Sequence, residues 1–134
     1  MSRSGYNEDC DDTWKRICWR GAVNSAIKGR YGQAFLKELL QVLDDMPEKR
    51  LIAGELEKDG EVCVLGAIGQ AREIDMSRLD PEDIEPIANA FNIANALARE
   101  IVWENDEAMP YWKEETPEQR YTRMRDWVAS QIKS

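Results

Sequence analysis

One stretch near the start of the chain restricts the fold more than any other. From Gln33 to Asp45, apolar residues recur at every third or fourth position, which places them on one face of an α-helix. These residues are Phe35, Leu36, Leu39, Leu40, Leu43 and Met46. Gly29, Gly32 and Pro47 bound the helix, because glycine and proline both interrupt helices. A helix with one apolar face must bury that face, so this stretch predicts a protein built from packed helices.

A second helix is predicted before it, beginning near Asp11 or Asp12 and ending at Lys28. Its apolar arc is wide. One stripe contains Trp14, Ile17, Cys18, Gly21, Ala22 and Ser25, and a neighbouring set, Trp19, Val23 and Ile27, continues the apolar surface around the helix. Such an arc predicts contacts on more than one side, and Gly21 and Ser25 would let another helix approach closely. The short linker predicts an antiparallel hairpin with helix 33–45.

The pattern changes after residue 49. Residues 50–57 are typical of a β-strand, Asp59-Gly60 supplies a tight hairpin turn, and residues 61–64 form the returning strand. A helix follows over 65–73, and more helices follow from Asp80 to the C-terminus. Thr116-Pro117-Glu118-Gln119 is a capping box, which starts the last helix.

Together these elements predict an α+β fold that is predominantly α. We expect a bundle of about five helices with one small β-hairpin packed on it. Residues 1–10 are expected to form a polar N-terminal arm, and residues 11–134 a single globular domain.

The charge of the chain is uneven. The 134 residues have a formal net charge of −8, and residues 51–118 contain seventeen Asp or Glu against five Lys or Arg. A field of this sign repels phosphates, so we expect no direct binding to nucleic acid. The acidic block either keeps the protein in solution or attracts a protein with a basic surface. The longest apolar runs fall short of the about 20 residues of a membrane span, which predicts a cytoplasmic protein with no membrane contact.

The residue types exclude much of ordinary enzyme chemistry. The chain has no histidine, the commonest general base and transition-metal ligand. Its three cysteines, Cys10, Cys18 and Cys63, lack metal-site spacing and indicate a reducing compartment. Acidic groups such as Glu82 and Asp83 suit the start of a helix. We therefore expect no metal, no cofactor and no enzymatic activity.

Cys63 is the candidate catalytic residue if that expectation is wrong. A thiol at the start of helix 65–73 would have a lowered pKa, and Asn105 and Asp106 could orient a reaction there. A nucleophilic cysteine also needs a base, and the chain has no histidine to serve as one. The simpler alternative is a small buried side chain where the hairpin meets the helix. A small Cys63-dependent enzyme or redox-sensitive factor is therefore the second functional hypothesis.

An exposed loop is predicted over 105–112, and its Met109–Trp112 part is the first choice for an element that contacts a partner. Large aromatic residues in loops often anchor interfaces, although a loop that covers its own core has the same composition. The candidate contacts are Met109, Tyr111, Trp112, Glu104, Asp106 and Glu107. Residues 85–102 imitate a helix-turn-helix, which makes a transcription regulator the third hypothesis, but Asn95 and Arg99 are its only suitable side chains and acidic residues follow them.

Several landmarks together resemble a family of small bacteriophage and prophage proteins. These are Cys63-Val64-Leu65-Gly66-Ala67, then Trp103-Glu104-Asn105-Asp106, the Thr116 helix start and a C-terminal amphipathic helix rich in arginine. The pattern identifies relatives rather than an activity. In physical terms, Asn105 and Asp106 suit structural roles, because their side chains can bond backbone groups where a helix ends or a close approach at Gly66 receives them.

The resemblance implies a phage-encoded accessory protein in the cytoplasm of a bacterial host. We expect it to bind a host or phage protein stoichiometrically, as a monomer or homodimer, through an acidic face that carries aromatic residues. Inhibition of a host defence or nucleic-acid-processing protein, in the manner of an anti-CRISPR, is the expected role.

Overall fold

The computed structural model describes residues 13–109 and 113–133, with side chains from Ile17 onward. The helices are α2 (Thr13–Lys28), α3 (Arg30–Asp45), α4 (Val64–Ala71), α5 (Ile84–Phe91), α6 (Asn95–Glu107) and α7 (Pro117–Gln131). A 3₁₀ turn, η1 (Met76–Arg78), and a hairpin of β1 (Glu57–Lys58) and β2 (Glu61–Val62) complete these elements. The predominantly α fold with one small hairpin is confirmed, with six α-helices in the described part rather than about five. The predicted polar arm, residues 1–10, lies outside the described residues.

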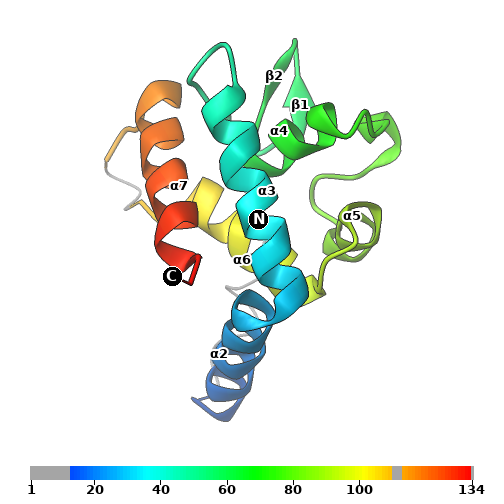
Figure 1. The fold of residues 1–134 in the computed structure, drawn as a ribbon, viewed down its shortest axis with the longest axis vertical. Helices are drawn as coiled ribbons and strands as arrows, with labels where there is room; N and C mark the ends of the chain where they lie inside the picture. Colours follow the sequence, from blue (N-terminus) through cyan, green and yellow to red (C-terminus); the bar gives the residue numbers. More distant parts are fainter. Residues whose placement is uncertain (1–12, 110–112, 134) are drawn as a thin grey trace.

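Helices α3 and α6 are the central elements of the bundle (Figure 1). Helix α3 contacts α2, α4 and α7, and α6 contacts α2, α4, α5 and α7. The predicted apolar stripe of α3 faces the core, where Leu36, Leu39 and Leu43 are fully buried. Burial of such a side chain contributes roughly 1.5–3 kcal/mol, so this face accounts for much of the stability of the bundle.

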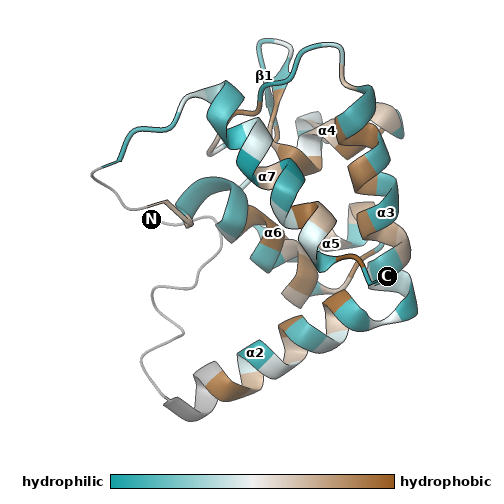
Figure 2. Cartoon of the chain, turned by 60° about the vertical axis from the view of Figure 1, so that its left-hand side comes forward, coloured by the Kyte–Doolittle hydropathy of each residue, from teal (hydrophilic) through white to brown (hydrophobic). Residues whose placement is uncertain are grey.

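Helices α2 and α3 do not form the predicted antiparallel hairpin. They meet at a corner, and α2 extends along the lower edge of the molecule, where it contacts α6 (Figure 2). Only Gly29 separates them, which is too short a linker to reverse the chain. The corner is tight, because a Cβ atom on Gly32 would lie 1.8 Å from the carbonyl oxygen of Ala26. We name residues 28–32 the α2–α3 corner.

The burial of α2 is also narrower than its sequence predicts. Val23 and Ile27 are buried, whereas Ile17 is 58% exposed and Cys18 is exposed. No described atom lies within 4 Å of a Cβ built on Gly21, apart from its own helix and chain neighbours, so the predicted close approach of another helix is wrong. One face of α2 therefore packs on α3 and α6, and among the described residues nothing covers the opposite face, which we name the open face of α2.

The strand predicted over 50–57 is largely wrong. Only Glu57 and Lys58 have the conformation of a strand, and residues 50–56 form a loop, although the Ile52 N–H donates to the Val62 carbonyl at 2.8 Å and the Leu56 carbonyl accepts from the Cys63 N–H at 3.1 Å. Gly54 has φ +85°, which breaks the extended conformation. The predicted turn is confirmed, since Asp59 and Gly60 both have positive φ.

Helix α6 continues where an exposed loop was predicted. It runs through Asn105 to Glu107, and Asn105 is 0% exposed. No glycine or proline occurs between Asn95 and Glu107, so nothing in this stretch stops the helix. The α5–α6 connection is a plain helical corner in which Asn92 adopts the left-handed conformation. Helix α6, the second helix of segment 85–102, packs on four other helices.

Helix α7 begins as predicted. The Thr116 hydroxyl accepts from the Gln119 backbone N–H, and the Gln119 side chain accepts from the Thr116 N–H, which forms the capping box. Tyr121, Met124 and Val128 then face the core, with Trp127 and Ile132 half-buried. None of the helices in the described part of the chain is both long and apolar enough to cross a bilayer.

Candidate functional site

The buried amide of Asn105 connects three segments of the chain. Its Oδ1 accepts from the backbone N–H of Val64 at 3.2 Å, and its Nδ2 donates to the carbonyl of Ile52 at 3.0 Å. The same Nδ2 donates to the Asp106 carboxylate at 2.8 Å, which in turn accepts from the N–H of Gly54. Helix α6 thus provides the partners for the start of α4 and for the 52–54 loop, because buried backbone groups must find partners.

Two arginines of α7 bind backbone carbonyls around Asn105. Arg120 donates to the carbonyls of Leu51 (3.1 Å) and Asn105 (3.2 Å). Arg123 donates to the Asn105 carbonyl as well, and both arginines pair with Glu115. Glu115 is almost buried, with 7% of its side chain exposed, so these bonds form in a partly desolvated site. The Asn105 centre, as we name Asn105 with these partners, is a structural network.

Cys63 lies beside this centre and is 0% exposed. It is the N-cap of α4, and its Sγ accepts from the N–H of Gly66 at 3.4 Å. Gly66 packs against the loop rather than receiving Asn105 or Asp106, since a Cβ there would lie 1.9 Å from the Leu56 carbonyl oxygen. The thiol therefore fills the position where the hairpin meets α4, and an external substrate would need the fold to open to reach it.

Glu104 lies one turn after Glu100 on α6 and is half-buried. Burial raises the pKa of the Glu104 carboxyl, and the nearby Glu100 carboxylate raises that pKa further, against the opposing charges of Arg123 and Arg20. Glu100 is itself buried and pairs with Arg20 of α2 at 3.1 Å through both oxygens. The Glu100 carboxylate therefore joins α2 to α6, whereas burial disfavours the ionised form of Glu104.

Of the other predicted partner contacts, some are described by the structure and some are not. Asp106, Glu107 and Met109 are half-buried, and Asp106 bonds within the Asn105 centre. Tyr111 and Trp112 lie outside the described residues. The predicted binding loop is therefore not an exposed acidic face in the part of it that the structure describes.

Exposed carboxylates gather instead around a notch between the hairpin and η1. The notch has a volume of about 240 Å³, and its lining is Glu55, Leu56, Glu57, Met76, Ser77, Leu79 and Pro81. Glu55 and Glu57 are exposed on its rim, and Asp75 and Asp80 are exposed at the two ends of η1. We name these four carboxylates and the notch the acidic edge. Hydrogen bonds from Ser77 lower the pKa of the Asp75 carboxyl, so Asp75 is ionised at neutral pH.

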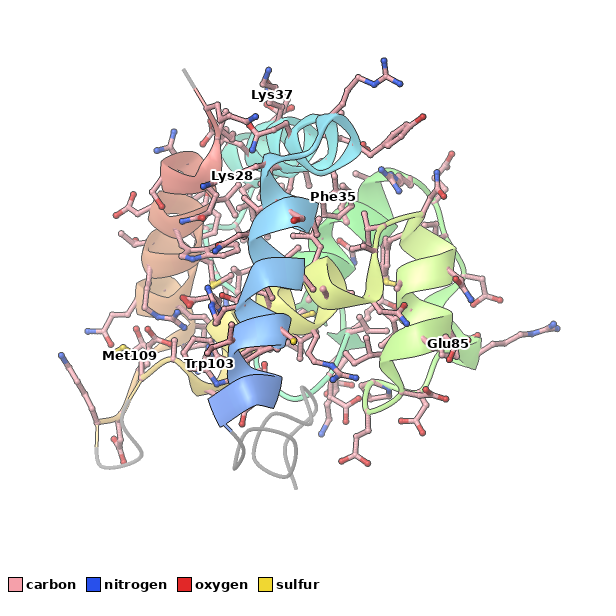
Figure 3. The ribbon with its side chains drawn as sticks, turned by 90° about the horizontal axis from the view of Figure 1, so that it is seen from below. Lys28, Phe35, Lys37, Glu85, Trp103 and Met109 are labelled. Atoms are coloured by element: carbon pink, nitrogen blue, oxygen red, sulfur yellow. The ribbon has the colours of Figure 1, made fainter. Side chains whose placement is uncertain are left out.

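The opposite charge gathers on α2 and the start of α3. Residues 13–37 contain six Lys or Arg and no Asp or Glu. Charge counts over long blocks of the sequence do not reveal this basic segment, whereas a count over about one helix length does. Lys28 and Lys37 lie on the side of the molecule seen at the top of Figure 3, and Glu85 of α5 lies on another side.

The described residues hold no group of three or more His, Cys, Asp or Glu with the geometry of a metal site. Comparison of the chain with protein-family models, curated proteins and solved structures finds no match.

Proposed function

We propose that the protein binds another protein stoichiometrically, and that the acidic edge contacts a basic surface of that partner. The observation that carries this proposal is the combination of four exposed carboxylates with a notch of mixed lining, polar through Glu55, Glu57 and Ser77. Charge of one sign steers a partner of the opposite sign, and a notch gives a side chain of that partner a place to anchor. A basic protein segment with one side chain that enters the notch fits both requirements.

Buried residues and hydrogen bonds hold the acidic edge in place. Leu56 and Met76 are buried, and the Leu56 carbonyl accepts from the N–H of Cys63 at 3.1 Å. Asp75 caps η1 through the N–H of Ser77. A surface that is already ordered loses little conformational entropy on binding, which favours affinity.

The resemblance to phage and prophage proteins extends this proposal to a biological role. The partner would be a host or phage protein whose basic surface normally meets nucleic acid, such as a defence protein, in the bacterial cytoplasm. An acidic protein that covers such a surface would act as an inhibitor by occupying the site of the phosphates.

Affinity capture from a lysate of the host bacterium, at about 0.1 M salt, tests the proposal with a matched control. One variant reverses two charges of the acidic edge, Glu55→Lys with Glu57→Lys. The control reverses two exposed charges elsewhere in the acidic block, Glu114→Lys with Glu118→Lys, for the same change in net charge.

We expect the unmodified protein and the control to retain a basic protein at about one copy each, and the acidic-edge variant to lose it. Retention of the same proteins by all three, or of none above a blank resin, would overturn the proposal.

A further inference from the structure

The two helical corners of the molecule border one groove. Its volume is about 570 Å³, and the α2–α3 corner and the α5–α6 corner both line it, through Gly29, Arg30, Tyr31, Asn92, Ile93 and Ala94. Tyr31 is 78% exposed at its edge. The groove is therefore an open surface feature with partly apolar walls.

The groove is electrically positive. Lys28 and Arg30 are exposed at its α2–α3 side. The N-termini of α3 and α6 border it, and so do the C-termini of α2 and α5. The partial charges of these four helix ends offset one another, so the positive charge of the groove comes from Lys28 and Arg30.

Helix α5 carries the opposite charge at its other end. Asn92, which lines the groove, follows the C-terminal end of α5, whereas Glu82, Asp83 and Glu85 are exposed at the N-terminal end. Eight helical residues rise about 12 Å, so the acidic end and the positive groove are separated by about one short helix. Figure 3 shows Glu85 on the outer side of α5.

The outward face of α5 between these charges has short side chains. Pro86, Asn89 and Ala90 are exposed, whereas Ile87 and Phe91 face the core. A face of this kind permits close approach of another flat surface. It is flanked by negative charge at one end and positive charge at the other, which makes it complementary to a copy of itself.

We propose that α5 and the groove form the interface of a symmetric homodimer. A two-fold axis across α5 places the two α5 helices antiparallel, so Glu85 of each copy faces Arg30 at the groove of the other. Both charge contacts form at once because the interface is isologous. The open face of α2 is a poorer choice, since α2 contains no Asp or Glu and two copies of it would have no opposite charges to pair.

The proposed dimerisation should depend on salt, because charges interact across the interface at both long and short distances. The net charge of −8 on each copy repels at long range, and about 0.1 M salt screens that repulsion beyond roughly 10 Å. Contacts between the groove and the α5 end are shorter and persist at this salt. We expect dimerisation to be strongest near 0.1 M salt and weaker near 1 M, where the Debye length is about 3 Å.

Sedimentation equilibrium of the full chain, with two single charge reversals, tests the dimer. Arg30→Glu and Glu85→Lys each place like charges in both contacts of a homodimer. We expect each variant alone to dimerise at least about tenfold more weakly than the unmodified chain. An equimolar mixture of the two should dimerise again, because every contact then joins opposite charges.

The control is Asp126→Lys on α7, which makes the same change in net charge as Glu85→Lys on a different helix. Circular dichroism confirms that each variant is folded, and the control is expected to dimerise like the unmodified chain. The proposal is overturned if the unmodified chain is monomeric at high micromolar concentration, if the mixture stays monomeric, or if the control also loses the dimer.

Discussion

Helices α2 and α4 each contain glycine among apolar residues, yet they occupy opposite environments. Every residue from Val64 to Gly69 of α4 is buried, and Gly66 lies against the Leu56 carbonyl. In α2 the same kind of stripe, around Gly21, faces outward. A stripe of small and apolar residues therefore predicts a surface able to pack, and the rest of the fold decides whether something within the chain packs on it.

The largest expected effect belongs to Gly66→Ala. The new Cβ would lie 1.9 Å from the Leu56 carbonyl oxygen, and backbone on both sides prevents an easy adjustment. We expect a loss of more than about 3 kcal/mol in the free energy of unfolding, or failure to fold. Urea denaturation measures it, and a loss below about 1 kcal/mol would contradict the close approach of α4 to the loop.

Asn105→Ala should have the next largest effect. It leaves the N–H of Val64 and the carbonyl of Ile52 without their side-chain partner. Each buried backbone group without a hydrogen-bond partner costs about 1–3 kcal/mol, so we expect the free energy of unfolding to fall by about 3 kcal/mol. Urea denaturation measures this change. Asn95→Ala, at the exposed start of α6, is the control and should change the stability little.

The two described thiols should differ in reactivity. Cys18 is exposed on the open face of α2, whereas Cys63 is buried at the start of α4. Iodoacetamide can reach Cys63 only when the structure opens, so we expect it to react at least about 100-fold more slowly than Cys18 in the native protein. Mass spectrometry of the labelled peptides measures both rates. Rapid labelling of Cys63 would favour a catalytic or redox role for this residue.

Gly21→Ala should stabilise the protein, unlike Gly66→Ala. Alanine is favoured over glycine within a helix by roughly 0.5–1 kcal/mol, and in the described residues nothing obstructs the new Cβ. Thermal unfolding should therefore shift upward by a few degrees. A downward shift would mean that another surface lies against this face of α2.

The smallest effect concerns pH. Burial and the Glu100 carboxylate raise the pKa of Glu104 in the folded protein, so ionisation of Glu104 disfavours folding as the pH rises through that pKa. Glu104→Gln removes this penalty and should stabilise the protein at pH 7 by roughly 0.5 kcal/mol. Well below the ordinary glutamate pKa of 4.5, the two proteins should be equally stable. Thermal unfolding of both proteins, at pH 7 and at a pH well below 4.5, checks the sign of the stability difference.

The elements that local sequence determines were predicted well. The capping box at Thr116 and the Asp59-Gly60 turn depend on a few adjacent residues, and both are formed. The apolar stripe of α3 likewise faces the core, because helical periodicity alone places it on one side.

What depends on distant segments was predicted poorly. Asn105 has partners at Ile52 and Val64, more than forty residues away, and no local pattern indicates that pairing. Residues 50–56 have the composition of a strand, but side chains of α6 and α7 bind the Gly54 N–H and the Leu51 carbonyl, and only Ile52 and Leu56 bond to the backbone of residues 62–63. The positive groove also joins corners some sixty residues apart, so its charge emerges only in the fold.

The buried Cys63 and Asn105 region maintains the fold, whereas we propose that the acidic edge recognises the partner. This division of roles is tested most directly by measuring partner capture and thermal unfolding together on two variants. Cys63→Ala should unfold at a lower temperature and still capture the same partner when folded. The Glu55→Lys and Glu57→Lys double variant should unfold at nearly the unmodified temperature and lose the partner. The reverse result, with capture lost by folded Cys63→Ala and kept by the double variant, would contradict the account.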